Sequence, residues 1–96
     1  MEWNSREMAN RFLTRANALH PDEADSSDEK YLLQGRQDVL YECYMNSFSK
    51  SVLLSFLQKA SEGDIGKIPD GVDDVIYKRA YVKESEAVIN EMGANE

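Results

Sequence analysis

Two residue types that often carry catalysis occur once each in this chain, as His20 and Cys43. His20 precedes Pro21 at the edge of a polar stretch, and Cys43 lies on the apolar face of an expected helix, where a buried structural thiol is usual. This arrangement gives no nucleophile–base pair, and one Cys with one His cannot supply the ligands of a zinc site. We therefore expect no catalytic residue, no bound metal and no cofactor, and we do not expect an enzyme.

Carboxylates crowd between Asp22 and Glu29 and could loosely hold a divalent cation. Their order does not match the calcium loop of an EF-hand, which needs a central glycine and a later bidentate glutamate. The glycines around Lys67 do not match a phosphate-binding loop either, since isoleucine follows the lysine. We interpret the first stretch as a solvated acidic linker and the second as a plain loop.

Acidic residues outnumber basic ones by 18 to 11, which gives a net charge of −7. Nucleic acids and anionic membranes would repel such a chain, whereas a basic protein surface would attract it. The carboxylates expected to form an acidic patch are Asp22, Glu23, Asp25, Asp28, Asp73, Glu84 and Glu91. A partner protein with a basic surface is therefore expected, without direct binding of nucleic acid or membrane.

Arg36 is the cation whose position is most unusual. Leu32 and Leu33 lie one helical turn before it, and Val39 and Leu40 lie one turn after it. A guanidinium at the border of an apolar face needs a carboxylate or another anion. One interpretation is a salt bridge to another helix, for which Glu86 is a candidate; the other is an anchor for a partner's carboxylate or an anionic ligand.

The elements that must position these residues are helical. Apolar residues recur at helical spacing over residues 5–19, 29–61 and 72–92. An acidic linker is expected at about 20–28, and a loop rich in Gly and Pro at about 62–71. The helix-forming content falls at 46–49, where the long central segment is expected to break or kink. The sequence therefore predicts an all-α bundle of three helices, or of four if the central segment breaks.

Helix starts and stops are predicted from capping residues. Ser5, Ser27 or Asp28, Ser47 or Ser49, and Asp70 are the expected caps at helix starts, and Gly63 and Gly93 the expected stops. Gly35, in the middle of a helix, suggests close packing.

Two apolar stripes run along the segment 72–92. The first passes through Val75, Val82 and Ile89 at 4-3 spacing, with Arg79 and Glu86 in the same row. The second consists of Tyr77, Tyr81, Val88 and Met92. A surface helix of a monomer needs one apolar stripe, so the second predicts an interface with another copy or another protein. The alternative is that the central segment covers both sides of this helix within one chain.

Length and composition place the chain in one domain, residues 1–96. The single cysteine excludes an intrachain disulfide, the N-terminus lacks a basic start with an apolar run, and no uninterrupted apolar stretch is long enough for a membrane span. We expect a cytoplasmic protein.

These observations favour a small acidic interaction or regulatory module, such as an adaptor, inhibitor or assembly factor, which forms homo-oligomers or binds another protein. One alternative is a nucleic-acid mimic that blocks a basic cleft; another is an enzyme subunit that is non-catalytic or shares its site between chains. In size and charge the chain resembles small proteins encoded by phages and mobile elements, many of which bind host machinery.

Overall fold

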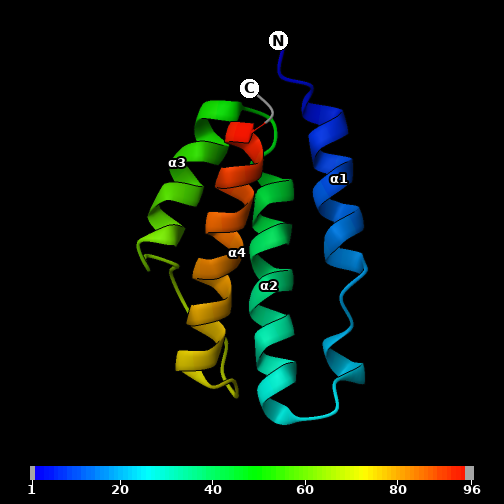
Figure 1. The fold of residues 1–96 in the computed structure, drawn as a ribbon, viewed down its shortest axis with the longest axis vertical. Helices are drawn as coiled ribbons and strands as arrows, with labels where there is room; N and C mark the ends of the chain where they lie inside the picture. The colour runs from blue at the N-terminus through cyan, green and yellow to red at the C-terminus, as the bar shows by residue number, and fades with distance from the viewer. Residues whose placement is uncertain (1, 95–96) are drawn as a thin grey trace.

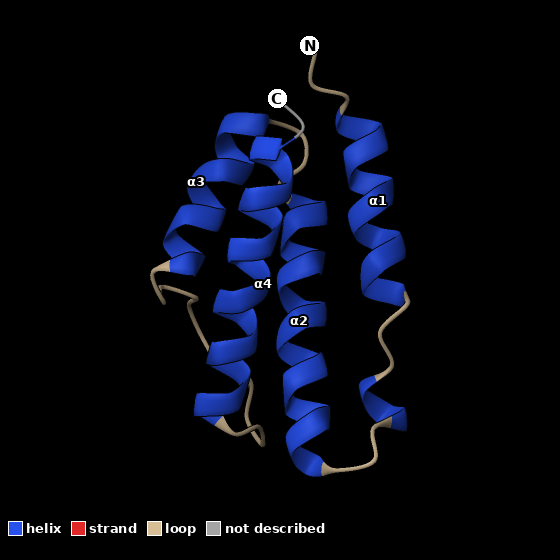
Figure 2. Ribbon diagram, viewed as in Figure 1, coloured by secondary structure: helices blue, strands red, loops and turns tan. Residues whose placement is uncertain are grey.

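The computed structural model describes residues 2–94, which fold into four α-helices and one short 3-10 helix, with no strand in that range. The helices are α1 (Ser5–Asn17), η1 (Pro21–Glu23), α2 (Ser27–Met45), α3 (Lys50–Ser61) and α4 (Asp74–Ala94), as Figures 1 and 2 show. The prediction of an all-α bundle is confirmed, in its four-helix form.

The predicted break at 46–49 is confirmed, and side chains hold it. The Ser47 hydroxyl donates to the Cys43 carbonyl at 2.6 Å, and the Trp3 indole N–H donates to the Ser47 carbonyl at 2.7 Å. Ser49 then caps α3 by accepting from the Val52 N–H. The Cys43 carbonyl near the end of α2 and the Ser47 carbonyl in the turn thus gain partners, and a second helix starts at once.

The other helix starts are displaced from the predicted residues. The capping side chains are Asn4 for α1, Ser26 for α2 and Asp73 for α4, and each accepts from the backbone N–H three residues on. Ser, Asp and Asn are crowded near each start, so several residues are equally suited by type. Gly63 ends α3 as predicted, at φ +94°, while α4 continues through Gly93 to Ala94. The linker is also not wholly irregular, because Pro21 opens η1.

In space the helices do not follow chain order: α4 lies between α2 and α3, and α1 packs on the other side of α2 (Figure 1). α1 and α3 run in one direction, and α2 and α4 in the opposite one. Because α4 lies between them, α2 and α3 diverge from the turn that joins them. The two helices cover two sides of α4.

This arrangement corrects the predicted interface on α4. Tyr77, Tyr81, Val88 and Met92 are buried in the core of the chain itself, with exposed fractions of 1–7%. In the other stripe, Val75 is 63% exposed and Arg79 and Glu86 are exposed, while Val82 is half-buried and Ile89 packs against the core. The alternative interpretation was the correct one: the two halves of the central segment cover α4, so a second chain is not needed to bury Tyr77 and Tyr81.

Candidate binding groove

The core of the bundle holds Cys43, and nothing there activates it. Cys43 is fully buried, and burial raises the pKa of its thiol to about 12. A thiol that stays protonated is a poor nucleophile. His20 is exposed and directly precedes η1. Among residues 2–94, no group of three or more His, Cys, Asp or Glu side chains is arranged to hold a metal ion.

Two tyrosines occupy the middle of the same core. The Tyr77 hydroxyl donates to the Asp38 carboxylate at 2.6 Å, and burial together with that bond raises the pKa of Tyr77. The Tyr81 ring meets Phe56 of α3 edge-on, and burial raises its pKa as well. These contacts bind α4 to α2 and α3, which is a structural role.

Arg36 forms an ion pair with another helix, as one of the two interpretations expected, but its partner is not the predicted one. Its Nε lies 3.7 Å from a carboxylate oxygen of Glu84, and its side chain is 40% exposed. Glu86, the predicted partner, is exposed. Glu84 is 11% exposed in its side chain, because it sits on the face of α4 turned toward α2.

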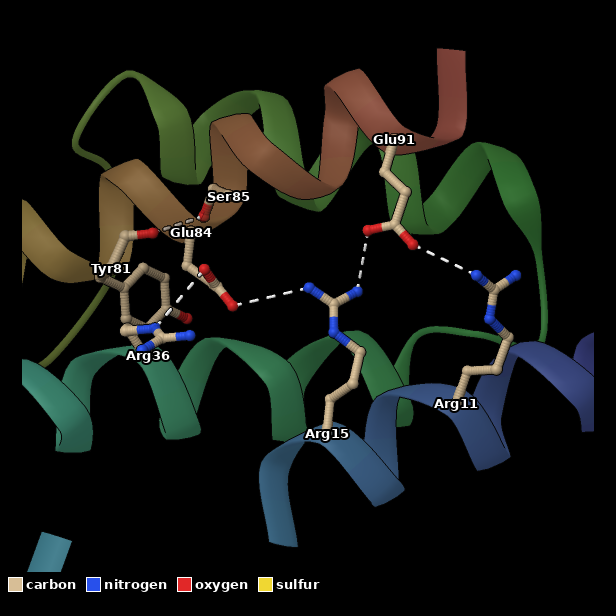
Figure 3. Close-up of polar contacts among 7 residues, drawn as sticks. All are labelled: Arg11, Arg15, Arg36, Tyr81, Glu84, Ser85 and Glu91. Atoms are coloured by element: carbon tan, nitrogen blue, oxygen red, sulfur yellow. Dashed lines mark hydrogen bonds and ion pairs between the residues drawn. The ribbon is translucent and has the colours of Figure 1, made fainter. Parts of the chain in front are cut away.

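Glu84 belongs to a ladder of alternating charges that crosses three helices (Figure 3). Arg15 of α1 lies 3.7 Å from Glu84 and 3.0 Å from Glu91, and Arg11 lies 3.2 Å from Glu91. The ladder Arg36–Glu84–Arg15–Glu91–Arg11 therefore links α2, α4 and α1. Among the described residues α1 and α4 do not pack extensively on each other, so these side chains span the space between them.

The carboxylates predicted as acidic surface, in the linker and on the last helix, differ in their surroundings. Asp22, Glu23, Asp25 and Asp28 are exposed near η1, Asp73 caps α4, and Glu84 and Glu91 pair with arginines. Three of the seven carboxylates thus have partners within the chain, because a carboxylate's surroundings depend on which helix face carries it.

Beside the ladder, the space between α1 and α4 forms a groove of about 560 Å³. Its apolar lining consists of Trp3, Met8, Phe12, Val88 and Met92, and its charged rim of Glu2, Glu7, Arg11, Arg15, Lys50 and Glu91. The volume is in the range of ligand and peptide pockets. We call this the α1/α4 groove.

Sequence reasoning missed the α1/α4 groove but named part of it. Val88 and Met92 belong to the stripe predicted to meet a partner, and they form the buried floor of the groove. Met8 and Phe12 belong to the apolar residues that recur at helical spacing over residues 5–19. The pair on α1 (Met8 and Phe12) and the pair on α4 (Val88 and Met92) line the same groove only because α4 packs against α2 and lies at a distance from α1.

A second apolar feature lies at the turn between α2 and α3. Tyr44, Met45, Phe48 and Val52 are 41%, 65%, 67% and 38% exposed, within nine positions of chain. We call these four residues the α2/α3 corner. It adjoins the α1/α4 groove through Trp3, which lines the groove and donates to the Ser47 carbonyl.

The chain was also compared with protein-family models, curated proteins and solved structures. None of the three comparisons finds a match. The function must therefore be inferred from the groove itself. None of the helices within residues 2–94 combines the length and apolarity needed to cross a membrane.

Proposed function

We propose that the protein is a small interaction module that binds a partner protein through the α1/α4 groove. The observation that carries this proposal is the groove itself, in which the half-buried Trp3 and Met8 lie over a buried apolar floor and charged side chains complete the lining. Apolar floors with a few well-placed polar groups are characteristic of binding sites.

The side chains around the groove support binding over catalysis. Cys43 is buried, and the rim offers guanidinium, ammonium and carboxylate groups that already pair with one another in part. Such groups orient and select a partner. The nucleic-acid mimic has less support, because three of its seven proposed carboxylates are already used in a cap or in ion pairs.

The proposal is tested by affinity capture from the native host with wild type and two variants. Met8→Glu places a charge in the groove, and Met45→Glu places one on the α2/α3 corner. Both variants should fold, since Met8 is only partly buried and Met45 is 65% exposed. The proposal expects a partner that wild type and Met45→Glu recover and that Met8→Glu loses. If Met8→Glu still recovers the partner and Met45→Glu loses it, the binding surface is the α2/α3 corner and not the groove.

A further inference from the structure

The α2/α3 corner gathers most of the exposed apolar side chains that the structure describes. Among residues 2–94, six large apolar side chains are exposed, and four of them are those of the corner, Tyr44, Met45, Phe48 and Val52. Going beyond the function proposed above, and without resting on it, we propose that the corner is a contact surface between two copies of this chain. The copies meet corner to corner about a twofold axis and form a transient dimer.

Hydrogen bonds hold the corner in one conformation while its side chains stay outside the core. The Ser47 carbonyl accepts from the Trp3 indole at 2.7 Å. The Phe48 carbonyl accepts from the Ser5 hydroxyl at 3.1 Å. The segment before α1 and the first residue of α1 thus fix the backbone of the turn, yet the side chains of Met45 and Phe48 remain exposed. An apolar surface that is already ordered loses little conformational freedom when it binds.

The corner lies in the longest stretch of the sequence that has no carboxylate. Residues 43–61 contain none of the 18 acidic residues, and their only charges are those of Lys50 and Lys59. A basic partner would find no carboxylate in this stretch to pair with, and the net charge of −7 would repel an acidic partner. The corner therefore suits an occupant whose own contact surface is apolar and free of carboxylates. The corner of a second copy has both properties, and a twofold axis pairs each patch with itself.

The charges that oppose a dimer lie far from the corner. Figure 1 shows the turn between α2 and α3 at one end of the molecule, and η1 with the starts of α2 and α4 at the other, along a long axis of 42 Å. Seven exposed carboxylates belong to that second end: Asp22, Glu23, Asp25, Asp28, Asp70, Asp73 and Asp74. In a corner-to-corner dimer the two acidic ends are many Debye lengths apart, each about 8 Å at physiological salt, so they repel each other weakly.

The size of the corner sets the strength of the contact. Its four residues expose roughly 400 Å², within the range of about 300–600 Å² for the largest apolar patch on a monomer, which is often functional. Two copies joined there bury roughly 800 Å² from these residues, and the polar residues around them add to that area. Interfaces below about 1,200 Å² are typical of transient complexes, so we expect a Kd on the order of 100 μM.

Sedimentation velocity at protein concentrations up to about 1 mM, ten times the expected Kd, tests the dimer. Phe48→Ser removes the most exposed side chain of the corner, and Val75→Ser is its matched control, because Val75 is 63% exposed on α4. Symmetry places each substitution in both copies, so Phe48→Ser should raise the Kd about tenfold or more, and Val75→Ser should leave it unchanged. Met45→Ser repeats the test at a second position of the corner, and thermal unfolding checks that all three variants fold.

Two results of that experiment would overturn the proposal. One is a wild-type chain that stays monomeric at about 1 mM. The other is a dimer that Phe48→Ser and Met45→Ser form as readily as wild type does.

The salt dependence separates an apolar contact from an ionic one. Raising the salt concentration from about 0.05 to about 0.5 M screens the repulsion between two acidic copies, so the dimer should become about two- to threefold tighter. A dimer held by opposite charges would become weaker instead, and that result would contradict a contact through the corner.

Cross-linking tests the twofold geometry. Cys43 is the only cysteine and is fully buried, so a short bismaleimide should leave the wild-type chain unmodified. Met45→Cys should give cross-linked dimers, because the two substituted positions lie near the twofold axis, and Val75→Cys should give few. Equal yields from the two variants would overturn the corner as the contact.

The outcome for the proposed function is separate, because capture of a partner by wild type and its loss by Met8→Glu do not depend on the corner. If the wild-type chain is a monomer and Met45→Glu loses a captured protein, the corner binds that protein, and the inference of a dimer fails.

Discussion

Gly35 of α2 lies directly against the carbonyl oxygen of Tyr77 on α4. A Cβ atom at position 35 would be 2.6 Å from that oxygen and 3.2 Å from the Ala80 Cβ. The two backbones approach this closely only because position 35 has no side chain. The contact fixes α4 against α2.

Gly35→Ala should therefore destabilise the fold even though alanine favours helix. Overpacking against a backbone carbonyl costs about 1–3 kcal/mol, which outweighs a helix-propensity gain of about 1 kcal/mol. Gly93→Ala is the matched control, because a Cβ there meets nothing within 4 Å. Urea unfolding followed by circular dichroism should show a lower midpoint for Gly35→Ala than for wild type. The midpoint of Gly93→Ala should not be lowered. Equal midpoints for the two variants would show that the close contact is unimportant.

The bond from Tyr77 to Asp38 should contribute measurably to stability. Tyr77→Phe removes the donor and leaves the half-buried Asp38 carboxylate without it, at a cost of about 1–2 kcal/mol. Tyr41→Phe removes a hydroxyl that donates to Asn17 at an exposed site, and it should cost less than half as much. The same unfolding experiment compares the two, and a larger loss for Tyr41→Phe would contradict the account.

Stability should fall in alkaline solution because of groups in this same core. The pKa of Cys43 is raised from 9.0 to about 12, and burial also raises the pKa of Tyr77 and Tyr81. The unfolded chain releases these protons first, so the free energy of unfolding decreases once the pH exceeds about 9, by up to about 1.4 kcal/mol per pH unit for one group. Below that pH these groups contribute no pH dependence.

Urea unfolding at several pH values between about 7 and 11 measures this slope. Cys43→Ala should be less stable throughout, because it leaves a small cavity, but its stability should fall less steeply just above pH 9. An identical slope for both proteins would show that Cys43 does not stay protonated in the fold.

Much of this fold was predictable from local pattern. The helical segments, the break near Ser47 and the stop at Gly63 all follow from apolar spacing and residue type. The burial of Cys43 followed in the same way. These features depend on residues within one or two turns of each other, which a single sequence displays directly.

The candidate site was not predictable, because it depends on which helices become neighbours. The stripe of Tyr77 and Tyr81 was correctly recognised as apolar, but the sequence could not show that α2 and α3 would cover it. The partner of Arg36 was misassigned for the same reason, since Glu84 and Glu86 differ only in the helix face they occupy. The α1/α4 groove combines two distant segments, so no local pattern marks it.

Within the charge ladder, Arg15 should matter more than Arg11. Arg15→Gln removes one of two cations beside the nearly buried Glu84, at an expected cost of about 1–2 kcal/mol. Arg11→Gln leaves the exposed Glu91 paired with Arg15 and should cost less than about 1 kcal/mol. Thermal unfolding of the two variants at one pH tests this prediction. A larger loss of stability for Arg11→Gln than for Arg15→Gln would contradict it.

The central claim is that the α1/α4 groove is where a partner binds. Hydrogen–deuterium exchange of the complex with the captured partner, against the free chain, tests it most directly. The account predicts slower exchange in α1 around Met8 and Phe12 and in α4 around Val88 and Met92, with little change at Met45 and Phe48. Protection confined to the α2/α3 corner, with α1 and α4 unchanged, would contradict it.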